Sequence, residues 1–562
     1  MFPMLDRLNE QQRLAATSAS PHLRILAGAG TGKTTTLTTR VAWLVASGVR
    51  PDRIMLVTFT RRAAREMVGR TNTMLSSIDA ARARSGGKVR AGTFHSIAHR
   101  TLRRHATSLG LPEGFSVLDP GDAADLIDMV RHEHLEQRST ERRFPRKATL
   151  LDLYSRAVNT QRPLSEVIDD VAPWTADRLE DIAVICRGYV ARKRSLGLLD
   201  FDDLLLHWRA AASDEHLGPA LAAELDHVCV DEYQDVNALQ VDLLRALCTS
   251  GSDVPGLTVV GDDSQAVYSF RGSSPRHLLD IDHVFPGIGT IALERNYRST
   301  QPILDLANAV GRDAPEGFST RLASVIGDGV RPELVTCTDE DAEVDAVCAR
   351  VLAHREAGVA LKAQAVLVRA AHHSALLELE LGRRRIPYVK YGGLRFLEAA
   401  HVKDLVCLYR LADNPRDELS WFRLLQLLDG VGPVSARRAI EALGVDRPGT
   451  PGEVLARWPD AVQWLPGGSR AAASELVAAL HRPSGESTGA QAERLTGALT
   501  PLIERAYDDA TVRLVDLDAL TAAAADQARV SDVAADLTLE PPHSAGDLAG
   551  PNVRGPEKAV RL

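Results

Sequence analysis

The chain has 562 residues, which is too many for a single hydrophobic core and indicates several domains. Its 45% hydrophobic and 25% charged residues are typical of a globular protein, and no apolar run reaches the ~20 residues that a membrane span needs. The net charge of −8 excludes a uniformly basic nucleic-acid binder, so that any nucleic-acid groove has to be a local basic lining on an acidic body.

Residues 23–37, LRILAGAGTGKTTTL, combine a short apolar strand, a glycine-rich turn and the start of a helix. This order is typical of a phosphate-binding loop, in which backbone N–H groups, a helix N-terminus and a lysine surround the phosphates while a hydroxyl binds Mg²⁺. The alternative, a glycine-rich turn with an incidental lysine, does not account for the strand before it and the GKT after it. The residues expected to bind nucleotide here are Ala27, Gly28, Ala29, Gly30, Thr31, Gly32, Lys33, Thr34 and Thr35.

The segments around this loop indicate a wound α/β domain. Gln12 lies one helix upstream, and its amide suits the edge of an adenine ring. A helix is expected over residues 40–47, a buried strand over 54–59 and another strand over 89–95. Residues 97–199 then show helical periodicity, which predicts a helical insertion. A basic cluster inside it is either a solvated face or a nucleic-acid contact; it consists of Arg138, Arg142, Arg143, Arg146 and Lys147 around Phe144.

An acidic pair follows the apolar strand expected over residues 227–230. Asp231 would hold a metal ion through water, and Glu232 would act as the general base on the attacking water. A further strand over 257–260 leads into GDDSQAVYSFRGS, where Gln265 could sense a γ-phosphate. Tyr268 and Phe270 alternate beside Arg271, a pattern suited to stacking on unpaired bases, although core aromatics are the alternative.

Eight segments in this order resemble the motifs of UvrD/Rep-type superfamily 1 DNA helicases: LNEQQ, AGAGTGKT, TFTRRAAREM, GTFHSI, DFDDLL, VDEYQD, VVGDDSQAVYSFRGS and LERNYRST. The resemblance implies an ATP- and Mg²⁺-dependent 3′→5′ translocase acting on single-stranded and duplex DNA. It also implies an α/β fold of two P-loop, RecA-like motor domains, each a parallel sheet with helices on both faces and a helical insertion.

The resemblance also implies roles for individual residues. Gln12 would read adenine, Tyr297 would stack on the base, Thr34 and Asp231 would hold the metal, and Glu232, Gln265 and Arg298 would be catalytic. The residues implied to bind DNA are Thr60, Arg61, His95, Tyr268, Phe270 and Arg271. Two positions depart from the pattern, since Ala27 replaces a glycine and Phe270 stands where tryptophan is frequent.

We expect the first motor domain at residues 1–96 and 200–284, the first part of the second at 285–395 with a strand at 365–369, and a mainly helical insertion at 396–555. Within that insertion, residues 430–435 (GVGPVS) resemble a hairpin that offers N–H groups to a DNA phosphate, although a tight helix–helix turn fits them equally well. Residues 556–562 would begin the return to the second motor domain, which is expected to be incomplete.

Two final motifs of the family, T-x-H-x-x-K-G-L-E and V-A-x-T-R-A, are expected after this point, and neither is found in the sequence. PHSAG at 542–546 mimics the first but lacks its lysine. We therefore expect either a DNA helicase impaired by the missing motifs or a non-motor module that binds ATP and single-stranded DNA and relies on a partner. A P-loop kinase or GTPase would leave the aromatic and NYRS motifs unexplained.

The cysteines and the N-terminus bear on the expected cellular compartment. The six cysteines contain no CxxC pair, and the N-terminus does not resemble a signal peptide. We expect reduced thiols, neither disulfides nor a zinc site, and a cytoplasmic protein.

Overall fold

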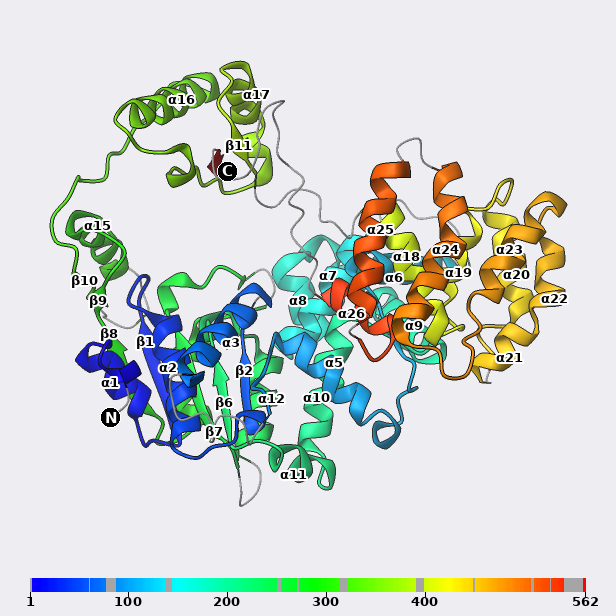
Figure 1. Cartoon of the computed structure of the whole chain (residues 1–562), viewed down its shortest axis with the longest axis horizontal. Helices are drawn as coiled ribbons and strands as arrows, with labels where there is room; N and C mark the ends of the chain where they lie inside the picture. Colours follow the sequence, from blue (N-terminus) through cyan, green and yellow to red (C-terminus); the bar gives the residue numbers. More distant parts are fainter. Residues whose placement is uncertain are drawn as a thin grey trace. The chain divides into compact units, whose positions relative to one another are not determined.

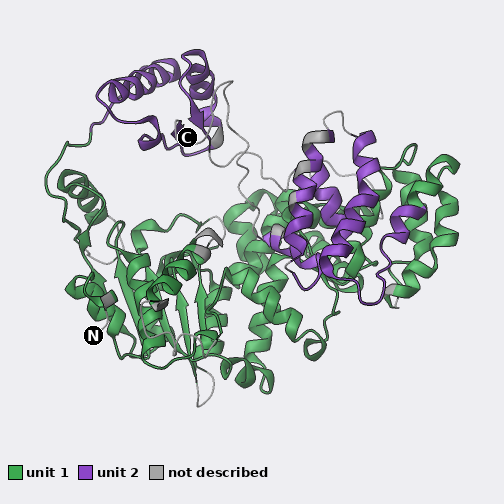
Figure 2. Cartoon of the chain, in the orientation of Figure 1, with its two compact units in different colours: residues 1–332, 410–473 green, residues 333–409, 474–562 purple. Residues whose placement is uncertain are grey.

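The computed structural model divides the chain into two compact units, residues 1–332 with 410–473 and residues 333–409 with 474–562 (Figure 2). It describes residues 3–59, 61–76, 87–136, 144–249, 254–269, 272–313, 317, 321–390, 399–447, 450–506, 510–525, 527–539 and 559–561. In these ranges no helix is long and apolar enough to cross a lipid bilayer.

The first unit is built on a six-stranded parallel sheet in the order β3-β2-β6-β7-β1-β8 (Figure 1). The strands are β1 (His22–Ala27), β2 (Ile54–Val57), β3 (Arg90–Gly92), β6 (His227–Val230), β7 (Gly256–Gly261) and β8 (Gly289–Leu293). Because the strands are parallel, their carboxyl ends meet along one edge, where open α/β sheets bind their ligands. The α/β class expected from the sequence is confirmed.

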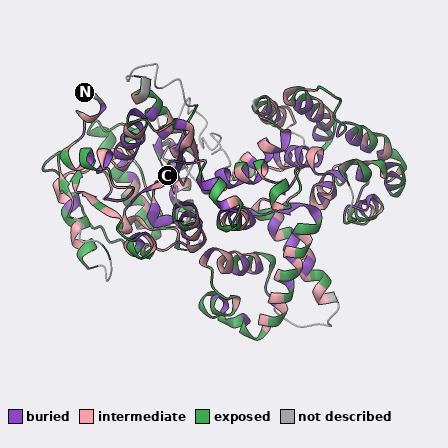
Figure 3. Cartoon of the chain, turned by 90° about the horizontal axis from the view of Figure 1, so that it is seen from below, coloured by how far each residue is buried: buried purple, intermediate pink, exposed green. Residues whose placement is uncertain are grey.

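Helices cover both faces of this sheet. Apolar side chains of β1 such as Ile25 pack with Leu37 and Val41 of α2 (Lys33–Ala46) in one core cluster. On the other face, the Arg24 guanidinium donates to the carbonyl oxygens of Leu278 and Leu279 in α13 (Arg276–Leu279), at 3.0 and 2.9 Å. The central strands are therefore almost wholly buried (Figure 3), as the continuous apolar runs in the sequence predict.

The other helices next to the sheet are α1 (Glu10–Thr17), α3 (Arg61–Ser76), α5 (Phe94–Arg104), α10 (Phe201–Ser213), α11 (Leu217–Ala222), α12 (Ala238–Thr249) and α14 (Ile281–Val284). Two predicted strand ends are wrong here, and the first is that of the strand expected over residues 54–59, which ends at Val57. The strand expected over residues 89–95 ends at Gly92, because Thr93 and Ser96 form a capping box that starts α5. His95 therefore lies on the first turn of a helix.

Helical segments complete the first unit. The insertion contains α6 (Pro120–Glu136), α7 (Lys147–Thr160), α8 (Leu164–Val171) and α9 (Leu179–Leu196), with the short parallel pair β4 (Ser116–Val117) and β5 (Leu198–Leu199). Residues 410–473 add α19 (Glu418–Leu425), α20 (Pro433–Leu443), α21 (Pro451–Ala456), α22 (Trp458–Ala461) and the start of α23 (Arg470–Ala478). After β8 come β9 (Arg295–Asn296), which pairs with β10 (Ala323–Ser324), and α15 (Gln301–Arg312).

The second unit holds a small α/β part and a group of helices. Its elements are α16 (Glu340–Glu356), α17 (Ala375–Arg383), β11 (Tyr388–Val389), most of α18 (Ala400–Asp413), α24 (Thr488–Ala506), α25 (Ala510–Ala524), α26 (Val530–Leu539) and β12 (Val560–Arg561). Strand β12 pairs in parallel with β11.

The strand expected over residues 365–369 is not formed. Of residues 365–369, all of which the structure describes, only Ala365 makes a bridge, to Arg561, and Leu367 is 94% exposed. A segment becomes a strand only where a hydrogen-bonding partner runs along it, and here β12 supplies a partner at the first residues alone.

Candidate nucleotide site

The phosphate-binding loop connects β1 to α2 and takes the geometry that its glycines permit. Gly30 and Gly32 have φ angles of +72° and +87°, which a residue with a side chain rarely adopts. Gly32 also occupies the N-cap of α2 without any side-chain cap. The buried Thr31 closes the turn, since its hydroxyl donates to the Gly28 carbonyl oxygen at 2.7 Å. The loop therefore leaves the N-terminal end of α2 without a side-chain cap, a geometry that suits the predicted binding of a phosphate.

Lys33 and Glu232 form an ion pair at this edge of the sheet. The Lys33 ammonium lies 2.9 Å from Glu232 Oε2, and the lysine side chain is only 11% exposed. Glu232 is the second residue after β6 and has a left-handed backbone with φ +50°, which is uncommon for glutamate. Such backbone conformations cost free energy and are concentrated at functional sites. The structure thus brings the predicted phosphate lysine and the predicted general base into direct contact.

Asp231 has the properties of a metal ligand. Its side chain is buried, and burial together with the neighbouring Glu232 raises the pKa of Asp231 to about 7. Its Oδ1 atom accepts no hydrogen bond from any described residue. A buried carboxylate oxygen without a partner, beside a phosphate-binding loop, fits Mg²⁺, which binds through one or two protein oxygens and substrate phosphates. Thr34, the second residue of α2, is the expected hydroxyl ligand.

Gln234 is a site residue that the sequence reasoning missed. Its side chain is 1% exposed, Nε2 donates to Glu232 Oε2 at 2.9 Å, and Oε1 accepts from the Asp262 N–H at 3.0 Å. Asp262 in turn accepts from Gln265 Nε2 at 2.5 Å. Gln234 therefore links the general-base candidate to the segment of the γ-phosphate sensor candidate. Only its position inside VDEYQD distinguishes it in the sequence.

The residues expected around the adenine lie next to the phosphate-binding loop. The amide of Gln12 is held on both sides: Nε2 donates to the Thr31 carbonyl oxygen at 2.9 Å, and Oε1 accepts from the Asn9 N–H at 3.1 Å. Asn9 Nδ2 donates to the Tyr297 hydroxyl at 2.9 Å, and the Tyr297 ring remains 45% exposed. The ring is thus available for stacking, whereas Gln12 has to exchange one of its bonds to read adenine.

A second set of contacts fixes the segment that carries Tyr297 and Arg298. The Tyr297 N–H donates to the Gly30 carbonyl oxygen at 2.8 Å, and Asn296 Nδ2 donates to the Ala29 carbonyl oxygen at 2.5 Å. A Cβ atom on Gly30 would lie 2.6 Å from the Arg298 Cβ. Arg298 is therefore anchored beside the phosphate-binding loop, where its predicted role requires it.

The candidate DNA contacts are only partly described. Tyr268 stacks on Phe59, with ring centroids 5.7 Å apart and planes 19° apart, and His95 lies 5.4 Å from the Phe201 ring. Arg61 begins α3, whereas Thr60, Phe270 and Arg271 lie outside the described residues. Phe59 was missed by the sequence reasoning, since it reads there as the end of a buried strand.

The basic cluster of the insertion is also only partly described. Arg138, Arg142 and Arg143 lie outside the described residues, and Lys147 forms an ion pair with Asp125. The choice between a solvated face and a nucleic-acid contact therefore stays open.

Two family models match this chain. Residues 8–286 match the UvrD/REP helicase N-terminal domain, and residues 291–443 match the UvrD-like helicase C-terminal domain. The chain belongs to the UvrD/Rep helicase family. Together the two matches include the phosphate-binding loop, the acidic pair, the aromatic segment and the anchored Arg298.

Several curated helicases are similar to this UvrD/Rep family member. The ATP-dependent DNA helicase Rep of Escherichia coli (strain K12) is 32% identical over 437 residues, which are 77% of this chain and 62% of Rep. DNA helicase II of the same organism is 32% identical over 425 residues, 75% of this chain and 56% of the relative. The ATP-dependent DNA helicase PcrA of Staphylococcus aureus (strain Mu50 / ATCC 700699) is 30% identical over 444 residues, which are 78% of this chain and 58% of PcrA. The chain thus spans 56–62% of the length of these relatives.

Three expectations from the resemblance stay predictions. The C-terminal domain model matches as far as residue 443, which leaves the expected absence of two final motifs untested. The expected division into domains also stays a prediction, although β8 at residues 289–293 adds to the first sheet. In the hairpin at 430–435, Gly432 caps α20 and Pro433 occupies its first turn, which fits both a phosphate-binding hairpin and a helix–helix turn.

Proposed function

We propose that this chain is an ATP-dependent DNA helicase that couples ATP hydrolysis to 3′→5′ movement along single-stranded DNA and to duplex unwinding. The observation that carries the proposal is the Lys33–Glu232 ion pair beside the buried Asp231 carboxylate, whose Oδ1 atom accepts no hydrogen bond from the described residues. A phosphate lysine, a general base and a metal ligand at one sheet edge are the groups that phosphoryl transfer to water requires. The names of the relatives, all ATP-dependent DNA helicases or DNA helicase II, support the same activity.

The proposed chemistry begins with an exchange of partners at Lys33. When the β- and γ-phosphates enter the loop, they compete with Glu232 for the ammonium, and Glu232 is released to orient a water molecule. Glu232 then accepts a proton from that water while the water oxygen attacks the γ-phosphorus, and the bond from the γ-phosphorus to the β,γ-bridging oxygen breaks, so that ADP is the leaving group. Bound Mg²⁺, held by Thr34 and Asp231, would neutralise charge on the phosphates. Gln265 would contact the γ-phosphate, and Arg298 would stabilise the charge that develops on it.

The proposed DNA site lies along the segments that follow β2, β3 and β7. Tyr268 would stack on bases together with Phe270, and Thr60, Arg61, His95 and Arg271 would contact the strand. The Phe59–Tyr268 stack supports this part of the proposal, because it orders an aromatic surface of the kind that unpaired bases use.

The test combines ATP hydrolysis with strand displacement. We expect single-stranded DNA to stimulate ATP hydrolysis, and a duplex with a 3′ tail to be unwound while one with a 5′ tail is not. Lys33→Ala is the inactive control. A chain that binds both ATP and DNA but shows no stimulation would instead support the second candidate, a non-motor module that relies on a partner. A chain that binds neither ligand would exclude both candidates.

A further inference from the structure

Asn159, in the last turn of α7 in the helical insertion, is a buried amide whose polar atoms are all bonded. Its Oδ1 accepts from Asn237 Nδ2 at 2.8 Å. Its Nδ2 donates to Asp202 Oδ1 at 2.7 Å and to the Ser155 carbonyl oxygen at 2.9 Å. Asn159 is 9% exposed, and it has no part in the chemistry proposed above. A buried amide satisfied on both sides has one defined orientation.

The first arm of this contact leads to the acidic pair. Asn237 lies five residues after Glu232, at the end of the loop that begins with Asp231. Asn237 and Gln240 form reciprocal hydrogen bonds of 3.0 Å between the side chain of each and the backbone N–H of the other, which starts α12. The loop that carries the metal ligand and general-base candidates is therefore fastened at its far end to α7 of the insertion.

The second arm leads to the aromatic segment. Gly272, four residues after Tyr268, has a φ angle of +79°, and a Cβ atom there would lie 3.0 Å from Thr160 Cγ2 and 3.5 Å from the Asn159 Cβ. The next residue, Ser273, forms an antiparallel bridge with Asn237. The segment that follows the DNA-stacking candidate thus lies directly against Asn159 and against the end of the acidic loop.

Three segments therefore meet at one side chain: the acidic loop, the aromatic segment and the end of α7. Separating the acidic loop from α7 would leave the buried amides of Asn159 and Asn237 without their mutual hydrogen bond, which is unfavourable. The aromatic segment is joined to the acidic loop by the Ser273–Asn237 bridge and packs against α7 at Gly272. We therefore expect a displacement of the acidic loop to shift residues 272–273 as well, because breaking the contacts between these segments costs more free energy than moving them together. The same geometry transmits a displacement in the opposite direction.

We propose that Asn159 is a positioning residue that couples the nucleotide site to the DNA site. It contacts neither ligand, and its role is to hold the acidic loop and the aromatic segment in a fixed relation. This inference rests on the proposed function, since it requires that both ATP and single-stranded DNA bind. Coupling between two sites is reciprocal, so it can be measured by binding alone, without hydrolysis.

The experiment measures the affinity for a single-stranded oligonucleotide with and without a non-hydrolysable ATP analogue and Mg²⁺. In the unaltered chain, we expect the nucleotide to change the DNA affinity by ~5-fold or more, the lower end of ordinary coupling. In Asn159→Ala, we expect this ratio to fall to about 1, while each ligand alone binds within about threefold of the unaltered chain. A purely structural role would weaken folding and both affinities, without removing the ratio selectively.

Asn414→Ala is the matched control. Asn414 is also a buried amide, 7% exposed, whose Nδ2 donates to the Leu196 carbonyl oxygen at 3.0 Å, and it has no bond to either loop. We expect a similar loss of thermal stability with the coupling ratio retained. Gly272→Ala is the second variant, because the added methyl group forces the aromatic segment away from Thr160 and should lower the ratio by an independent route.

The outcomes separate this inference from the proposed function. An unaltered chain that binds neither nucleotide nor DNA contradicts the proposed function. An unaltered chain that binds both without mutual effect overturns the inference alone. It is equally overturned if Asn159→Ala and Gly272→Ala both keep the full ratio, or if Asn414→Ala loses it to the same extent.

Discussion

Lys33 has two competing partners in the proposed cycle, the Glu232 carboxylate and the phosphates of ATP. The Lys33 ammonium lies 2.9 Å from the Glu232 carboxylate, and the low exposure of Lys33 shields the pair from solvent. Removing the lysine therefore removes a phosphate contact. Removing the charge of Glu232 instead eliminates both the group that competes with ATP for Lys33 and the general-base candidate. The two substitutions therefore separate nucleotide binding from ATP hydrolysis.

For this pair we expect Lys33→Ala to weaken nucleotide binding. We expect Glu232→Gln to retain binding and to slow hydrolysis by ~10²–10⁴-fold, as general-base loss does. A nucleotide titration and an ATPase assay on both variants measure this. Lys390→Ala, which removes a lysine paired with Glu378 in the second unit, is the control and should change neither quantity. Normal binding by Lys33→Ala together with lost binding by Glu232→Gln would reverse the assigned roles.

The raised pKa of the buried Asp202 carboxyl makes the stability of the folded chain depend on pH. Burial and the neighbouring Asp200 raise the pKa of Asp202 to about 7, above the ~3.9 of an unfolded aspartate. Between these values the folded state binds the extra proton, so the contribution of Asp202 to stability falls as the pH rises.

Asp202→Asn removes this titration. We therefore expect the thermal midpoint of the variant, relative to the unaltered chain, to be higher at pH 8 than at pH 5. Scans at several pH values with the ligands left out measure the difference. Equal offsets at both pH values would mean that Asp202 is ionised in the folded chain throughout this range.

Local signals predicted the elements of the first sheet well, and tertiary partners explain what was missed. The apolar runs at β1, β2, β6 and β7 identify parallel strands, because such strands are buried on both faces. The GKT sequence and the acidic pair predict the candidate nucleotide site for a different reason. The groups proposed to carry its chemistry are next to one another in the sequence.

Gln234, Phe59 and Asn159 could not be identified in this way. Their partners lie far away in the sequence or depend on the backbone conformation of a neighbouring loop, as the Asn159–Asn237 bond shows. The capping box of Thr93 and Ser96 that ends β3 early is a local signal. It was missed because the residues between β3 and Ser96 also fit the continuation of a strand.

The Phe59–Tyr268 stack predicts a measurable contribution to DNA binding. We expect Tyr268→Ala to weaken single-strand affinity by ~1–3 kcal/mol with little dependence on base sequence, because every base has a stacking face. Fluorescence titration with homopolymeric oligonucleotides measures it. Trp174→Ala, which removes a 60% exposed aromatic side chain elsewhere, serves as the control. An unchanged affinity in a folded Tyr268→Ala protein would assign this tyrosine to packing against Phe59.

The whole chain carries a net charge of −8, yet it is proposed to bind a polyanion. Binding must then be dominated by a local group of cations that displaces counterions from the phosphates. We expect the logarithm of the DNA affinity to fall linearly with the logarithm of salt concentration, with a slope of about −0.7 for each phosphate contacted on a single strand. Affinity that does not depend on salt would show that the acidic body is not offset by such a basic lining.

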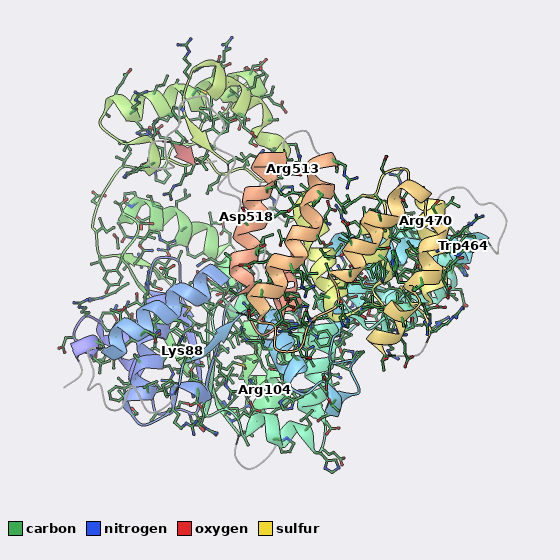
Figure 4. The ribbon with its side chains drawn as sticks, turned by 45° about the vertical axis from the view of Figure 1, so that its right-hand side comes forward. Lys88, Arg104, Trp464, Arg470, Arg513 and Asp518 are labelled. Carbon is green, nitrogen blue, oxygen red and sulfur yellow. The ribbon has the colours of Figure 1, made fainter. Side chains whose placement is uncertain are left out.

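The two family domains match at residues 8–286 and 291–443, so each unit contains only part of the second match. The exposed Trp464, labelled with Arg470 in Figure 4, belongs to the first unit although it follows the second match in the sequence. Sequence order alone therefore does not give the compact units, because their contacts join segments that lie far apart in the chain.

The bonds between residues 296–297 and the phosphate-binding loop bear on how Arg298 would reach the phosphates. Strand β8 is paired with β1, and Asn296 and Tyr297 are bonded to the carbonyl oxygens of Ala29 and Gly30. The first residues of the C-terminal domain match are thus hydrogen-bonded to the phosphate-binding loop. Because these bonds hold the backbone next to Arg298, we expect this arginine to meet the γ-phosphate as soon as ATP enters the loop, as a resident group of the site.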